Sequence, residues 1–121
     1  MFDLTEITKQ HKELFPKATA ESQFYKLEEE IQELAAAIQD VDKPHQIKEL
    51  ADIWIVCAGL YRWFPETAMC VYCRYIDVSN QLGIEYDDVV QEVRRKWNVN
   101  NLREWVWDGK TYQHKGKDGN E

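Results

Sequence analysis

The stretch KELADIWIVCAGL, residues 48–60, constrains the fold more than any other part of the chain. Its apolar side chains surround nearly the whole circumference of a helix that turns about 100° per residue. Such a helix has to be covered by other elements, and in a chain this short a second subunit is one candidate. Asp52 stands near the start of this stretch. Because an unpaired buried carboxylate is costly, Asp52 must be protonated, paired or bound to a metal ion.

Prolines, glycines and apolar periodicity divide the rest of the chain into further helices. Pro44 suits the first turn of a helix, and Gly83 suits the position just past a helix end. The expected helices span 4–15, 20–39, 45–63, 66–82 and 85–104. Alternation with a period of two residues is scarce, and 121 residues amount to one domain. We therefore expect an all-α fold, an antiparallel bundle of four to five helices in a single domain over 1–107.

The composition changes after Trp107 to Gly, Lys, Asp and Asn. With no Asn-Gly or Asp-Gly turn recognised between apolar runs, residues 108–121 are expected to form a loop and a flexible tail. Tyr112 and His114 in this segment are then expected to be disordered. The alternative is that they fold over the functional site as a lid.

The formal net charge is −7, from 22 acidic and 15 basic residues. This balance argues against a nucleic-acid-binding surface, which needs basic residues to neutralise phosphates, but it permits a small phosphate-bearing ligand bridged by cations. The longest nearly uncharged run, 53–61, is too short for a membrane span, which takes about 20 apolar residues. No signal-peptide pattern is recognised, so we expect a cytoplasmic protein without membrane association.

The three cysteines, Cys57, Cys70 and Cys73, do not form a disulfide framework. Cys70 and Cys73 have the spacing of half a zinc site, but no second CxxC or HxxxH pair completes it. Buried, reduced thiols are therefore expected at all three positions.

Two pairs of carboxylates share the same helical spacing. The apolar stripe of the 20–39 helix consists of Leu27, Ile31, Leu34 and Ile38. Glu30 and Glu33, three residues apart, lie on a ridge beside this stripe. Glu49 and Asp52 repeat the spacing on the next helix and are expected to face inward. The four acids should therefore converge between the two helices.

Converging carboxylates repel one another unless something positive lies between them. Lys26 and Lys48 flank the pairs, and no Arg occurs between positions 1 and 61. Oxygen ligands suit hard cations, so Mg²⁺ is expected, with Mn²⁺ able to substitute for it. In the alternative interpretation the glutamates are solvated and Asp52 forms one structural ion pair. A di-iron site would need Glu-x-x-His motifs, and no helix carries one.

The acidic segments resemble a known signature. LEEEIQEL, followed after a break by ELADI, resembles the EExxE…ExxD motif of the all-α NTP pyrophosphohydrolases, the MazG-like superfamily. Residues 29–33 match the first half of the motif and residues 49–52 the second. KWNVNNLREW, residues 96–105, is similar to a K-x-x-x-N-x-x-R-x-W run found late in several short MazG-like proteins. The resemblance covers about residues 20–105.

The resemblance implies a Mg²⁺-dependent enzyme that cleaves a (d)NTP to a monophosphate and pyrophosphate, in nucleotide-pool cleansing or control. It assigns Glu30, Glu33, Glu49 and Asp52 to metal binding and catalysis. Glu29 matches the first acid of the motif, but it faces away from the others on the helix, which makes it a weaker ligand or an intersubunit residue. It also implies a homo-oligomer, a dimer or tetramer. One alternative is a catalytically inactive helical module of the same fold that binds a nucleotide or a partner. Another is a plain helical interaction module whose acids only keep it soluble.

Substrate-binding residues are expected on the last helix. Lys96, Asn100 and Arg103 share one helix face and suit phosphates or a ribose, unless this face is merely solvated or contacts a second subunit. Lys26 is a further phosphate candidate, or else it pairs with Glu30. Candidates for stacking on a base are Phe24, Trp97, Trp105 and Trp107. The base and sugar remain open, and phosphoribosyl-ATP, the substrate of a related branch, stays among the alternatives.

Overall fold

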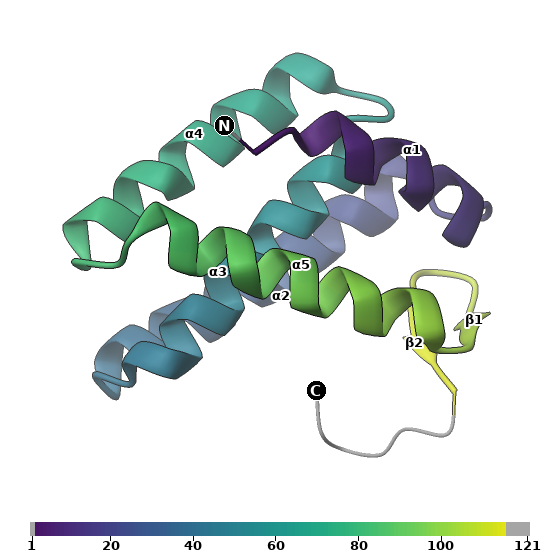
Figure 1. The fold of residues 1–121 in the computed structure, drawn as a ribbon. Coiled ribbons are helices and arrows are strands. Elements are labelled where there is room, and N and C mark those ends of the chain that lie inside the picture. Colours follow the sequence, from purple (N-terminus) through teal and green to yellow (C-terminus); the bar gives the residue numbers. More distant parts are fainter. Residues whose placement is uncertain (1, 116–121) are drawn as a thin grey trace.

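The computed structural model describes residues 2–115, which form five helices and one small two-stranded sheet (Figure 1). The all-α prediction is confirmed, and the five helices lie within a few residues of their expected ranges. The elements are α1 Leu4–Leu14, α2 Ala20–Gln39, α3 Lys43–Leu60, α4 Pro65–Gln81, α5 Tyr86–Leu102, β1 Trp105–Trp107 and β2 Tyr112–His114.

Local hydrogen bonds explain where the helices begin and end. α2 starts at a capping box, in which the Ser22 N–H donates to Thr19 Oγ1 at 3.0 Å and the Thr19 N–H donates to Ser22 Oγ at 2.9 Å. At the start of α3, the Asp42 carboxylate accepts from the His45 N–H at 3.1 Å. Past the end of α4, Gly83 takes the left-handed conformation with φ 72°, as its position predicts.

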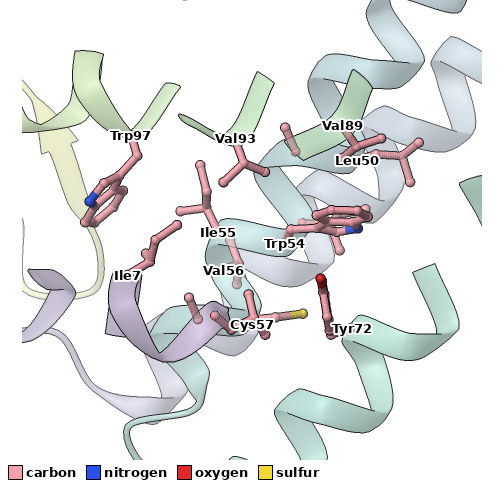
Figure 2. Packing of buried hydrophobic residues seen from close by; sticks show 14 of the residues in the cluster. Ile7, Leu50, Trp54, Ile55, Val56, Cys57, Tyr72, Val89, Val93 and Trp97 are labelled. Atoms are coloured by element: carbon pink, nitrogen blue, oxygen red, sulfur yellow. The ribbon is translucent and has the colours of Figure 1, made fainter. Parts of the chain in front are cut away.

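α3 runs through the middle of the molecule and packs against α1, α2, α4 and α5 (Figure 1). Its apolar surface is therefore covered within one chain, and the interpretation in which a second subunit buries it is wrong. In Figure 2, the Trp54 ring of α3 lies between Val89 of α5 and Tyr72 of α4, with ring centroids of Trp54 and Tyr72 5.0 Å apart. Within residues 2–115, no helix combines the length and apolar character needed to cross a membrane.

The C-terminal segment corrects the prediction of a loop and tail. β1 and β2 pair antiparallel as a hairpin, so the prediction is wrong for residues 112–114, and a boundary at 107 cuts through the hairpin. Residues 116–121 lie outside the described part of the chain. The strands have three residues each, which is too short for a period of two residues to be recognised.

The turn of this hairpin does contain an Asp-Gly pair, which the sequence prediction overlooked. Asp108 Oδ1 accepts hydrogen bonds from the backbone N–H groups of Lys110 and Thr111, both at 2.8 Å. Gly109 has φ 97°, a conformation that glycine adopts without steric cost. Asp-Gly between two short aromatic strands was therefore a usable hairpin signal.

Two further predictions about burial are wrong in part. Cys57 is buried, but Cys70 and Cys73 are exposed on α4. Ile38, near the end of α2, is 38% exposed, and the fully buried residue there is Ala37. α4 has packing partners on one side only, and the end of α2 extends beyond its neighbour. Helical periodicity by itself reveals neither arrangement.

Candidate functional site

Three acidic side chains from α2 and α3 meet at the contact between these two helices. Carboxylate oxygens of Glu30, Glu49 and Asp52 all lie within 4.8 Å of one another. Glu33, one turn further along α2, is exposed and borders the same cavity as the other three. The helical spacing thus brings Glu30, Glu49 and Asp52 together, with Glu33 at the rim.

The environment of the three acids disfavours their charged forms. Burial and the nearby charge of Asp52 raise the pKa of Glu30 to about 9. Burial, followed by neighbouring charge, also raises the pKa of Glu49. Burial raises the pKa of Asp52 as well, although Lys96 acts in the opposite direction. Glu49 Oε1 is buried and, within residues 2–115, has no hydrogen-bond partner apart from the neighbouring acids.

A lysine from α5 reaches this cluster, in addition to Lys26 and Lys48, which the sequence places beside the acids. Lys96 Nζ is 2.8 Å from Asp52 Oδ2, although 44 residues separate the two in sequence. The ion pair of Asp52 that the alternative interpretation proposed is therefore present. His45 Nε2 also lies 3.1 Å from Glu49 Oε2. One lysine cannot balance three ionised carboxylates, which agrees with the raised pKa values of all three acids.

The acids form part of the lining of a cavity of about 330 Å³. All eight residues proposed from the sequence for catalysis, metal binding or substrate binding border it, namely Lys26, Glu30, Glu33, Glu49, Asp52, Lys96, Asn100 and Arg103. Arg103 Nη2 is buried without a hydrogen-bond partner within residues 2–115. Lys26 Nζ lies 3.7 Å from Glu29 Oε1, so its ion pair is with Glu29 and not with Glu30. Glu29 borders the cavity too.

Several aromatic side chains also line the cavity, and sequence reasoning missed His11 and Phe15 among them. Phe15, in the α1–α2 connection, has its ring centroid 5.0 Å from that of Trp105 and 4.9 Å from that of Tyr112. Tyr112 and His114 of β2 border the cavity, so the alternative in which these side chains fold over the site agrees with the structure. The Asp-Gly turn after Trp107 is the signal that could have predicted this.

Buried polar groups lie beside the aromatic residues. Burial and the nearby Arg62 lower the pKa of His11 to about 3, and Arg62 Nη1 is 3.1 Å from His11 Nδ1. Gly59 of α3 makes room for His11 and Gln23, because a Cβ at this position would lie 2.6 Å from His11 Nε2 and 2.5 Å from Gln23 Oε1. No motif in the sequence indicates these contacts.

One of the four aromatic residues considered for base stacking borders the cavity, and this residue is Trp105. Trp97 is buried in the core, as Figure 2 shows, and its indole N–H donates to Gln10 Oε1. Phe24 lies against Phe64, with ring centroids 6.1 Å apart, beside a different hollow.

The model of the family described as phosphoribosyl-ATP pyrophosphohydrolase matches residues 4–97, a range that contains the three clustered acids and Lys96 and ends before the hairpin. No curated protein and no solved structure matches the chain. Since this family is an all-helical branch of the MazG-like NTP pyrophosphohydrolases, the resemblance read from the two acidic segments is confirmed. The chain therefore belongs to the phosphoribosyl-ATP pyrophosphohydrolase family, a family of helical pyrophosphohydrolases that act on nucleotide-like substrates.

Proposed function

We propose that this chain is a Mg²⁺-dependent pyrophosphohydrolase that converts a (d)NTP to a (d)NMP and pyrophosphate. The observation that carries the proposal is the cluster of Glu30, Glu49 and Asp52, whose carboxylate oxygens converge within 4.8 Å beside a cavity of about 330 Å³. A cavity of this size falls within the range of small-ligand sites in proteins.

The residues of the cluster fit a hard divalent cation. Within residues 2–115, the buried Glu49 Oε1 has no hydrogen-bond partner apart from the neighbouring acids. The three carboxylates offer the oxygen ligands that Mg²⁺ or Mn²⁺ prefers. Glu30, Glu49 and Asp52 would hold the ion, with Glu33 close enough to the cavity to contribute. When bound, such an ion neutralises charge on phosphate oxygens and lowers the pKa of a water molecule.

The other residues of the cavity suit the binding of a triphosphate. In the reaction, the oxygen of water forms a bond to the α-phosphorus, and the bond from this phosphorus to the bridging oxygen of the β-phosphate breaks. Pyrophosphate leaves with the electron pair, and a carboxylate of the cluster takes the proton of the water. Arg103 Nη2, which has no hydrogen-bond partner among residues 2–115, can donate to a phosphate oxygen. Lys96, held by Asp52, and Lys26 add positive charge, and Asn100 can bind a phosphate or the ribose.

Two alternatives remain relevant. The first is phosphoribosyl-ATP as substrate, which the description of the matching family favours. The second is a catalytically inactive module of the same fold that binds a nucleotide or a partner without turnover. Both alternatives retain the acidic cluster, so only an analysis of the reaction products distinguishes them from the proposed function.

A panel of NTPs, dNTPs and phosphoribosyl-ATP, incubated with the protein and Mg²⁺ and analysed for pyrophosphate and phosphate, tests the proposal. We expect pyrophosphate and a (d)NMP, with turnover close to background in EDTA and in Glu49→Gln. Glu28→Gln, on an exposed position of α2, is the matched control and should keep full activity. Full turnover in EDTA would contradict the metal requirement. Stabilisation by Mg²⁺ without turnover would instead favour the inactive binding module.

We also propose that the protein forms a homo-oligomer. Phe24 and Phe64 lie side by side and are 42% and 48% exposed, and Met69 of α4 is 40% exposed. Exposed apolar side chains on neighbouring helices are typical of protein–protein contacts. Sedimentation equilibrium should give a dimer or tetramer for the wild type and a lower mass for Phe64→Ser, whereas a monomeric wild type would contradict this proposal.

A further inference from the structure

One face of α2 presents a row of polar side chains to the cavity. Its members follow one another at steps of three or four residues, and in chain order they are Gln23, Lys26, Glu30 and Glu33. Glu30 lies about 10 Å beyond Gln23 along the helix axis. With the metal and phosphates at the acids and a phosphate at Lys26, as in the proposed function on which this inference rests, the base of the substrate extends toward Gln23.

Aromatic rings lie beside Gln23. The ring centroids of His11, which contacts Gln23, and Phe15 are 4.9 Å apart, and those of Phe15 and Trp105 are 5.0 Å apart. All four side chains border the cavity. Aromatic rings provide surfaces on which a base can stack. A base that stacks at this end of the cavity therefore lies close to the Gln23 amide.

The hydrogen bonds of His11 fix its tautomer. Arg62 Nη1 lies 3.1 Å from His11 Nδ1, and because a guanidinium can only donate, Nδ1 has to accept. Arg62 Nη1 also donates to the Phe15 carbonyl at 3.0 Å, which anchors the guanidinium. Burial and the charge of Arg62 lower the pKa of His11 to about 3, so the ring is neutral at pH 7. A neutral imidazole carries one N–H, and in His11 it is therefore on Nε2.

The proton on His11 Nε2 determines which end of the Gln23 amide faces it. His11 and Gln23 share a hydrogen bond, and a Cβ at Gly59 would lie 2.6 Å from His11 Nε2 and 2.5 Å from Gln23 Oε1. Because Nε2 donates, the amide oxygen accepts and the NH₂ group points away from His11. One amide hydrogen makes a long contact of 3.4 Å to Ser22 Oγ, and within residues 2–115 the other has no acceptor. This buried amide therefore offers an N–H donor to the cavity.

We propose that Gln23 binds the base of the substrate. Its amide N–H donates to a ring nitrogen or carbonyl oxygen of the base, and His11 and Arg62 are positioning residues that hold the amide in this orientation. A buried donor is costly to leave without an acceptor, so a ligand that supplies one is favoured. The bases of NTPs and of phosphoribosyl-ATP all carry such acceptors, so this contact is available to either kind of substrate.

Gln23→Glu tests the donor, because the new carboxylate still accepts from His11 Nε2 but has an oxygen in place of the NH₂ group. For the best nucleotide we expect kcat/KM to fall about tenfold or more, since the oxygen cannot donate and repels an acceptor. Tripolyphosphate with Mg²⁺ has no base, so its inhibition constant should stay at the wild-type value. Gln32→Glu, the same substitution at an exposed position of α2, is the matched control and should keep both values.

The positioning roles have readouts of their own. Nitrogen NMR of the wild type, with the signals of His11 assigned by their loss in His11→Gln, should show a protonated Nε2 and an unprotonated Nδ1 at neutral pH. Arg62→Met removes the donor to Nδ1, so it should raise KM for the nucleotide and leave the inhibition constant of tripolyphosphate unchanged. In Gln23→Glu, activity relative to the wild type should recover as the pH falls, because protonation of the new carboxyl restores a donor.

Each outcome has a distinct meaning. A proton on Nδ1 of His11 in the wild type overturns the inference, and this result does not depend on any variant. An unchanged kcat/KM in a Gln23→Glu protein that is folded by circular dichroism also overturns it. An equal loss for the nucleotide and for tripolyphosphate overturns it too, because the damage then lies at the phosphates. No turnover of any nucleotide by the wild type overturns the proposed function itself, and the inference with it.

Discussion

Replacing Glu30 with glutamine is expected to stabilise the metal-free protein at neutral pH. Glu30 has a pKa of about 9 in the folded protein, against 4.5 as the ordinary value. In this interval the folded state holds a proton that the unfolded state has released, so the free energy of unfolding falls as the pH rises from 4.5 toward 9. Glutamine cannot ionise, yet its amide can donate to Glu49 as the neutral carboxyl of Glu30 does.

The size of the effect follows from the shift in pKa. One proton held by the folded state alone changes the free energy of unfolding by up to about 1.4 kcal/mol per pH unit. From pH 4.5 to neutral pH is about 2.5 units, which gives an upper limit of about 3.5 kcal/mol at pH 7 for Glu30.

Urea unfolding in EDTA between about pH 5 and pH 9 measures how the free energy of unfolding depends on pH. Glu28→Gln, on an exposed position of the same helix, is the control. We expect Glu30→Gln to show a flatter dependence on pH than the wild type, while Glu28→Gln keeps the wild-type slope. Adding Mg²⁺ should stabilise the wild type and have a smaller effect on Glu30→Gln. If Glu30→Gln is less stable than the wild type at pH 7 and keeps the same slope, the assignment of a buried, repelling cluster is wrong.

Two further predictions concern the polar groups beside the cavity. His11 has a pKa of about 3 in the fold against 6.5 ordinarily, so its contribution to stability is present above pH 6.5 and is lost as the pH falls toward 3. His11→Gln should therefore lose less stability than the wild type on acidification in urea unfolding, and an equal loss would contradict this. Gly59→Ala should cost about 1–3 kcal/mol despite the higher helix propensity of alanine, because its Cβ would overlap His11 and Gln23. A variant as stable as the wild type in the same assay would refute that reasoning.

Short-range sequence patterns were sufficient to predict the helices and the face on which each acid lies. The capping box of Thr19 and Ser22 and the C-terminal signal of Gly83 operate within a few residues, so they can be read without the fold. The spacing of Glu30 with Glu33 and of Glu49 with Asp52 is equally local. These features limit the chain to a helical bundle with acids between two consecutive helices.

Contacts between distant segments could not be predicted in this way. The ion pair of Lys96 with Asp52 depends on how α5 packs against α3, which periodicity does not specify. The exposure of Cys70 and Cys73 likewise depends on which face of α4 has a neighbour. The hairpin was missed because three-residue strands carry little pattern, although its Asp-Gly turn was present in the sequence.

The sequence by itself determined the helical fold and the two acidic ridges, because both depend on residues a few positions apart. The tertiary structure decided which acids meet, which cation reaches them and which hairpin side chains line the same cavity. It placed Tyr112 against Phe15 and left room at Gly59 for His11, and these contacts join segments that are tens of residues apart. The positions of the acids on their helices thus depend on local sequence, whereas the shape of the cavity depends on how distant segments pack.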